Sequence, residues 1–109
     1  MTIVLKQGVT LQGLQPVMRI VLREADEIWK THNQQLTITS CCDGCHSAVS
    51  WHYYGYALDF RTNFWEADEA RDVYLDLKQQ IPDFDVVHHD THIHCEIGNS
   101  LAEKLGVLF

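Results

Sequence analysis

Basic side chains are scarce in this chain. Its 109 residues include 8 lysines and arginines against 15 aspartates and glutamates, which gives a formal net charge of −7. Nucleic-acid binding depends largely on cationic side chains that neutralise phosphates, so this balance argues against such a partner. We therefore expect a function that does not involve nucleic acid.

Long apolar runs are also absent from the sequence. No stretch approaches the roughly 20 apolar residues that a membrane-spanning helix needs. The amino-terminal segment lacks the basic start and long apolar run of a signal peptide. We therefore expect no membrane insertion, no signal peptide and synthesis in the cytoplasm. In that reducing compartment the four cysteines are expected to form no obligatory disulfide.

Repeats, low-complexity tracts and Pro/Gly/Ser-rich linkers are missing as well, which argues against several units joined in series. The chain is long enough for one modest hydrophobic core, and 46% of its residues are apolar. We expect a single domain over residues 1–109, and a monomer.

Hydrophobic periodicity predicts two main helices. Apolar residues recur at helical spacing over residues 15–32, and again from Ala67 to Ile81, where Pro82 ends the pattern. The tail from Asn99 onward is expected to contain a short helix.

The remaining segments read as strands, because β-branched and alternating apolar residues fill them. They span residues 35–40, 56–60, 85–88 and 91–97, with the last two as an antiparallel pair. The predicted fold is α+β, a small antiparallel sheet with two main helices packed on it.

Histidines are concentrated in one part of the chain: all except His32 lie between positions 46 and 94. They form two clusters, and clustered imidazoles beside carboxylates are typical of a zinc site. In the first cluster, Gly55 permits a turn between His52 and a carboxylate, Asp59, on the following strand. In the second, alternation on a strand turns the following side chains to one face if the strand is regular: Asp90, His92, His94 and Glu96.

These clusters resemble the motifs of a family of zinc peptidases. The family includes D-alanyl-D-alanine carboxypeptidases, the penicillin-insensitive murein endopeptidase and phage endolysins, with the hedgehog amino-terminal signalling domain as a relative. Its first motif, Ser-x-His-x-x-Gly-x-Ala-x-Asp, is similar to residues 50–59 without a gap, and its final His-x-His pair is similar to residues 92–94. The similarity spans about residues 37–98.

The resemblance implies a hedgehog-like or D,D-peptidase-like fold and one catalytic Zn²⁺. The implied metal ligands are His52, Asp59 and His94, which leave a fourth coordination position open. It also implies that His92 and His89 act beside the metal, one as proton acceptor and one as stabiliser of the charged intermediate. The expected substrate-binding residues are Ser50, His46 and Tyr54.

Two positions depart from the family pattern. Thr91 stands where many members have a carboxylate three residues before the last ligand, which leaves the role of base to His92, which we favour, or to Asp90. The arginine that carboxypeptidase members carry upstream of the first motif is replaced by residues 41–43. This replacement favours an endopeptidase over a carboxypeptidase, unless Arg61 reaches the pocket.

The sequence therefore predicts a zinc-dependent peptidase that hydrolyses peptide bonds in peptidoglycan stem peptides or cross-links. A phage or prophage lysis enzyme that acts on the cell wall after release would fit this pattern. One alternative is a non-catalytic, zinc-holding binding module of the hedgehog type, which Thr91 favours. Another is a small cysteine-based zinc or redox protein that uses Cys42 and Cys45, with Cys41, His46 or Cys95 as further ligands.

Overall fold

A computed structural model gives the structure of the chain and describes residues 3–41 and 55–107. The structure contains, in chain order, β1 (Val4–Leu5), the 3₁₀ helix η1 (Pro16–Met18), α1 (Arg19–Thr31), β2 (Thr37–Ser40), β3 (Ala57–Arg61), α2 (Ala67–Gln80), β4 (Phe84–His88), β5 (His92–Ile97) and α3 (Asn99–Lys104). The predicted α+β class is confirmed.

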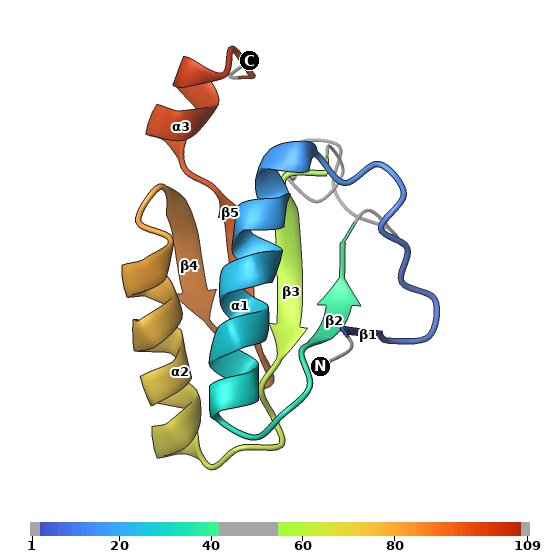
Figure 1. The fold of residues 1–109 in the computed structure, drawn as a ribbon, viewed down its shortest axis with the longest axis vertical. Helices are drawn as coiled ribbons and strands as arrows, with labels where there is room; N and C mark the ends of the chain where they lie inside the picture. The colour runs from blue at the N-terminus through green and yellow to red at the C-terminus, as the bar shows by residue number, and fades with distance from the viewer. Residues whose placement is uncertain (1–2, 42–54, 108–109) are drawn as a thin grey trace.

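One five-stranded sheet organises the domain, in the order β1-β2-β3-β5-β4 (Figure 1). The pairs β2–β3, β3–β5 and β5–β4 are antiparallel, as expected for the larger part of the sheet. The first pair, β1–β2, is parallel, and the sequence pattern did not predict β1 at all. A strand of two residues is too short to show a period, and it forms because its backbone pairs with β2.

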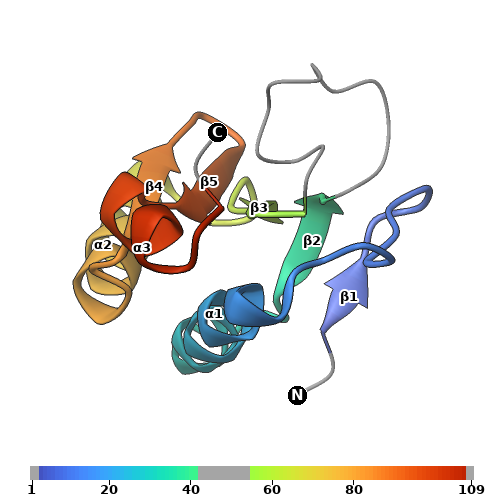
Figure 2. The same ribbon diagram turned by 90° about the horizontal axis from the view of Figure 1, so that it is seen from above.

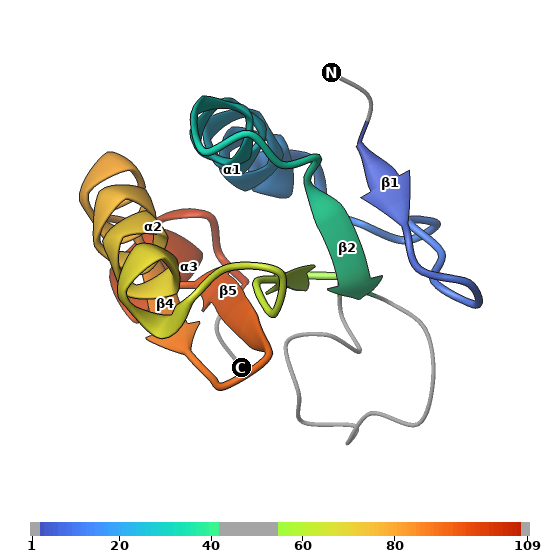
Figure 3. The ribbon, with the colours of Figure 1, turned by 90° about the horizontal axis from the view of Figure 1, so that it is seen from below.

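Helices α1 and α2 pack on the same face of the sheet (Figures 2 and 3). Their predicted apolar stripes are buried there, through Met18, Val21 and Ala25 on η1 and α1 and through Val73 and Leu77 on α2. No helix of the described residues covers the opposite face, which we call the open face.

Strand β5 shows how the sheet separates apolar from polar side chains. Ile93, Cys95 and Ile97 are buried in the core, whereas the alternate residues, among them His92 and His94, are partly exposed. Successive side chains of a strand point to opposite faces, so the polar residues of β5 lie on the open face.

Trp29 fixes the carboxyl end of β3 against α1. Its ring centroid lies 5.6 Å from that of Phe60 in an edge-to-face arrangement. Its indole Nε1 donates a hydrogen bond of 3.1 Å to the carbonyl oxygen of Arg61. These contacts fix the position of β3, and with it Asp59, relative to α1.

Among residues 3–41 and 55–107, none of the helices combines the length and apolar character that crossing a bilayer demands.

Candidate metal centre

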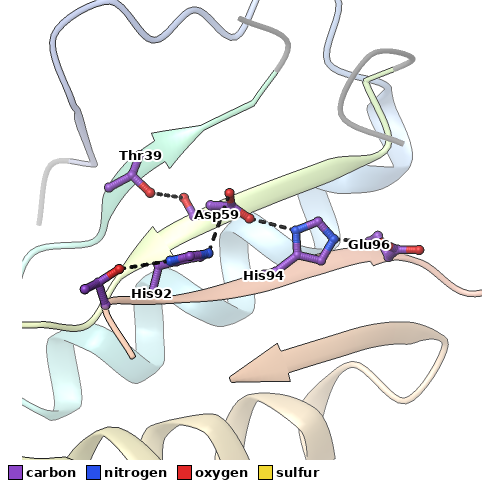
Figure 4. Close-up of polar contacts among 6 residues, drawn as sticks. Thr39, Asp59, His92, His94 and Glu96 are labelled. Atoms are coloured by element: carbon purple, nitrogen blue, oxygen red, sulfur yellow. Dashed lines mark hydrogen bonds and ion pairs between the residues drawn. The ribbon is translucent and has the colours of Figure 1, made fainter. Parts of the chain in front are cut away.

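Asp59 and His94, two of the three predicted metal ligands, lie side by side on the open face (Figure 4). They occupy directly opposite positions on β3 and β5, although 35 positions separate them in the sequence. His94 Nδ1 and Asp59 Oδ1 are 2.7 Å apart, and the two side chains are only 17% and 15% exposed. Sheet topology therefore brings this imidazole and this carboxylate together in a partly desolvated position.

A second carboxylate holds the other side of the His94 ring. His94 Nε2 lies 2.7 Å from Glu96 Oε1, two residues along the same strand (Figure 4). Burial alone would lower the pKa of His94, but the hydrogen bonds and negative charges of Asp59 and Glu96 outweigh it and raise the pKa. Without a metal, the pair of carboxylates thus favours the imidazolium form.

This arrangement fits a zinc ion. A neutral imidazole that donates Nε2–H to Glu96 presents a lone pair at Nδ1, and a lone pair facing the Asp59 carboxylate needs a cation between them, either a proton or a metal. Two atoms bound to tetrahedral zinc at about 2.0–2.1 Å lie roughly 3.3 Å apart. The observed 2.7 Å would need to widen by roughly 0.6 Å to admit the ion, a small side-chain adjustment.

The third predicted ligand, His52, falls outside the described residues, as do the expected substrate-binding residues His46, Ser50 and Tyr54. Within the described ranges, no group of three or more His, Cys, Asp or Glu side chains is arranged to hold a metal. The described part of the centre consists of the Asp59–His94 pair and the carboxylate of Glu96 behind it.

His92 lies next to this pair on the open face. Its Nε2 is 4.0 Å from Asp59 Oδ2, and its side chain is 31% exposed. The Thr91 hydroxyl lies 3.1 Å from His92 Nδ1, and the His89 ring stacks on the His92 ring at 4.7 Å between centroids. His92 therefore lies beside the carboxylate of Asp59, whereas His89 contacts His92 and lines a separate pocket.

Asp90, the rival candidate for the base, has a different position. Strand β5 begins at His92, so the argument from strand alternation does not extend to Asp90, which is exposed in the turn after β4. Asp90 lines a pocket of about 260 Å³ together with His88 and His89, whereas Asp59 and His92 line another. Of the two candidates for the base, strand alternation therefore places only His92 on the same face of the sheet as Asp59.

The segment around Asp59 is further fixed by β2. The register between β2 and β3 shifts between Ile38 and Ser40, and Thr39 Oγ1 donates a hydrogen bond of 3.5 Å to the carbonyl oxygen of Asp59. Such irregularities redirect side chains at functional sites. The sequence pattern predicts neither the register shift nor the hydrogen bond.

Cys95 faces the core rather than the metal centre. Its side chain is fully buried, and burial, together with the negative charge of Asp59, raises the pKa of the thiol far above its ordinary value. A thiolate is the form that binds zinc or reacts in redox chemistry, so Cys95 is poorly suited to the cysteine-based alternative. Cys41 is buried as well, and Cys42 and Cys45 lie outside the described residues.

Gly55, the glycine of the first motif, approaches the loop before η1 very closely. It has a φ of +81°, and a Cβ placed on it would clash with the carbonyl oxygen of Gly13. The Gly55 carbonyl in turn accepts a hydrogen bond of 3.0 Å from the backbone N–H of Gln15. Glycine is thus required in the turn just before β3 by both conformation and space.

We expect Gly55→Ala to lower the free energy of unfolding by roughly 2 kcal/mol or more, because a left-handed conformation and a backbone clash both oppose the new methyl group. Urea unfolding followed by circular dichroism measures this loss. Gly8→Ala is the matched control, since Gly8 also has a positive φ of +89° but nothing within 4 Å of the added Cβ. Equal losses in the two variants would contradict the close approach to Gly13.

The raised pKa of His94 makes a prediction for the metal-free protein. A group whose pKa is higher in the folded state stabilises the fold fully below its unfolded value of about 6.5, and this contribution is lost as pH rises through the folded pKa. In the presence of chelator, we expect the free energy of unfolding to decline above about pH 6.5, and His94→Gln to reduce this decline. Urea titrations from pH 6 to 9 measure the slope, with His88→Gln as control; an unchanged slope in His94→Gln would contradict the prediction.

No protein-family model and no curated protein matches the chain. The resemblance to zinc peptidases therefore depends on the motif residues themselves.

Proposed function

We propose that this protein is a zinc-dependent peptidase that cleaves peptide bonds of peptidoglycan. The single observation that carries the proposal is the Asp59–His94 pair, with Glu96 on the far side of the imidazole. A ligand histidine whose second nitrogen donates to a carboxylate is a recurring arrangement in zinc proteins. The pair also lies on the open face, where a substrate can approach it.

In this proposal His52, Asp59 and His94 hold one Zn²⁺ and leave a coordination position open. When bound, the ion supplies Lewis acidity, which polarises a peptide carbonyl and lowers the pKa of water. The three ligands come from two separate parts of the chain, so the centre forms only in the folded domain.

His92 is the base that we favour. If Nδ1–H donates to the Thr91 hydroxyl 3.1 Å away, Nε2 carries the lone pair and faces Asp59, so it can accept the proton of an attacking water. Thr91 then has a positioning role at the place where other family members carry a carboxylate. His89, stacked on His92, is the candidate to stabilise the charged intermediate.

The cellular setting follows from the same resemblance. The enzyme would act as a monomer on the cell wall after its release, as a phage or prophage lysis enzyme does, and the endopeptidase and carboxypeptidase reactions both remain within this proposal.

A zinc-holding binding module without catalysis is the second candidate. The observation in its favour is that Thr91 replaces a carboxylate and that Asp90 lines a different pocket from Asp59. Such a module would bind zinc and a peptide ligand but would cut nothing.

Mass analysis of muropeptides before and after incubation with the zinc-loaded protein tests the proposal and identifies the bond. We expect products whose masses correspond to hydrolysis of one peptide bond of the substrate. Chelator should abolish these products, and added zinc should restore them. His92→Ala should abolish the products while zinc stays bound. A zinc-loaded protein that leaves all muropeptides intact would favour the binding module.

We expect Glu96→Gln to weaken zinc binding by roughly 10- to 100-fold, the range seen when the outer partner of a ligand histidine is removed. Competition with a chromophoric chelator measures the zinc affinity. Asp85→Asn is the matched control, because Asp85 is paired with Glu96 across β4 and β5 and is exposed. The role given to Glu96 is wrong if both variants bind zinc as the wild type does.

A further inference from the structure

A pocket of about 350 Å³ adjoins the candidate metal centre and is lined by two cationic side chains, Lys6 and Arg61. Asp59 and His92 form part of the same pocket, and hydroxyl groups are contributed by Thr39 and Thr91. The chain has only 8 lysines and arginines and a net charge of −7, so two cations in one pocket are unusual for this molecule. Their placement points to a ligand with negative charge.

The backbone fixes both cations at this place. Lys6 follows β1, and its N–H donates a hydrogen bond of 2.9 Å to the carbonyl oxygen of Ile38 on β2. Arg61 lies two residues after Asp59 and opposite His92, so that its side chain is on the open face. β1, the strand that the sequence pattern did not predict, is therefore the element that brings Lys6 to the pocket.

Neither cation is neutralised by its surroundings in the part of the chain that the structure describes. No described carboxylate lies within ion-pair distance of Lys6 or Arg61. The carboxylate of Asp59, which lines the same pocket, is engaged by His94 instead. Among the described residues, the groups that line the pocket are thus two cations without an ion-pair partner, the paired carboxylate of Asp59, and the imidazole of His92.

We propose that this pocket binds a carboxylate group of the substrate, with Arg61 as the main anchor and Lys6 as the second. A guanidinium donates two parallel hydrogen bonds to a carboxylate, which fixes its orientation, and the ammonium adds a point charge. The hydroxyl of Thr91, which accepts the hydrogen bond from His92 Nδ1 in the tautomer described above, keeps its own O–H as a further donor. As a substrate preference the proposal rests on the proposed function, but the binding itself can be measured with or without metal.

The consequence concerns specificity. Because the pocket adjoins Asp59, a bound carboxylate would lie close to the bond that is cut, so peptides with a free carboxylate near the scissile bond are preferred. That carboxylate belongs either to the chain terminus or to an acidic side chain of the stem peptide. Arg61 would then serve the purpose of the arginine that the sequence lacks upstream of its first motif.

Nuclear magnetic resonance titration of the labelled protein with three small probes tests the proposal. N-acetyl-D-alanine carries a terminal carboxylate, N-acetyl-D-glutamic acid 1-amide carries only a side-chain carboxylate, and N-acetyl-D-alaninamide carries none. We expect one or both acids to shift the backbone signals of the pocket, the amide not to do so, and 0.5 M NaCl to weaken the binding. The preferred acid identifies the source of the carboxylate.

Substitutions assign the binding to the two cations. Arg61→Gln should weaken binding of the preferred acid about tenfold, because it removes hydrogen bonds to a charged group. Arg61→Lys keeps the charge but loses the paired hydrogen bonds of the guanidinium, so its affinity for the acid should lie between those of the wild type and Arg61→Gln. Lys6→Gln should weaken binding by roughly threefold, since this side chain is exposed. Arg71→Gln, which removes a cation from α2, should bind as the wild type does.

Binding of the amide as tightly as the acids, or unchanged binding in Arg61→Gln, would overturn the proposal. Zinc affinity, measured separately, keeps this outcome distinct from failure of the proposed function. Acid binding without zinc binding would contradict the proposed peptidase function but support the carboxylate pocket. Zinc binding and muropeptide cleavage without preference for the acids would contradict only the carboxylate-binding proposal.

Discussion

Replacing Asp59 with asparagine is expected to lower the affinity for zinc by more than about 100-fold, beyond the loss seen for outer partners of metal ligands. The substitution removes the anionic oxygen that lies 2.7 Å from His94 Nδ1, while it preserves the size of the side chain. A neutral amide oxygen is a much weaker ligand for zinc than a carboxylate. The proposed peptidase activity should be lost together with zinc binding.

Chelator competition measures the zinc affinity of Asp59→Asn, and circular dichroism verifies that the variant is folded. Asp85→Asn removes an exposed carboxylate from β4, which is separated from β3 by β5, and should bind zinc with wild-type affinity. If Asp59→Asn retained zinc affinity within tenfold of the wild type, Asp59 would not be a ligand.

Replacing Phe60 with alanine is expected to lower the free energy of unfolding by about 3–5 kcal/mol, because the ring is fully buried and its removal leaves a cavity. Phe60 also makes the edge-to-face contact with Trp29 that joins β3 to α1. Domains of this kind are typically stable by only about 5–15 kcal/mol, so the loss is a large share of the total. Because Phe60 adjoins Asp59, the metal centre should loosen as well.

Urea unfolding of the metal-free protein measures this effect without a contribution from bound zinc. Leu75→Ala is the control: Leu75 is 47% exposed on α2, and its truncation should cost about 0.5 kcal/mol or less. A similar loss in both variants would show that Phe60 is not part of the core that supports β3.

The helices and most strands could be predicted from the sequence because their burial is periodic. The stripe through Met18, Val21 and Ala25 is visible in the sequence and is fully buried in the structure. The alternation from His92 to Ile97 likewise separates the open face from the core. In both cases the period of the element itself carries the information.

Other features depend on contacts between distant segments, which no local pattern records. β1 exists because its backbone pairs with β2, and it brings Lys6 into the pocket of Asp59. The direct pairing of Asp59 with His94 requires β5 to lie between β3 and β4, an order that differs from the order in the chain. Alternation along β5 carries no information about Asp90, because the strand begins at His92 and Asp90 lies in the bend before it.

Metal content combined with X-ray absorption spectroscopy tests the central claim most directly. The folded protein, loaded with zinc and freed of excess metal, should contain one zinc ion per chain. Its spectrum should show only nitrogen and oxygen ligands, with zinc bonded at about 2.0–2.1 Å and no sulfur at about 2.3 Å. A folded protein that retains no zinc, or zinc bound by thiolates alone, would contradict the account of Asp59 and His94 as metal ligands.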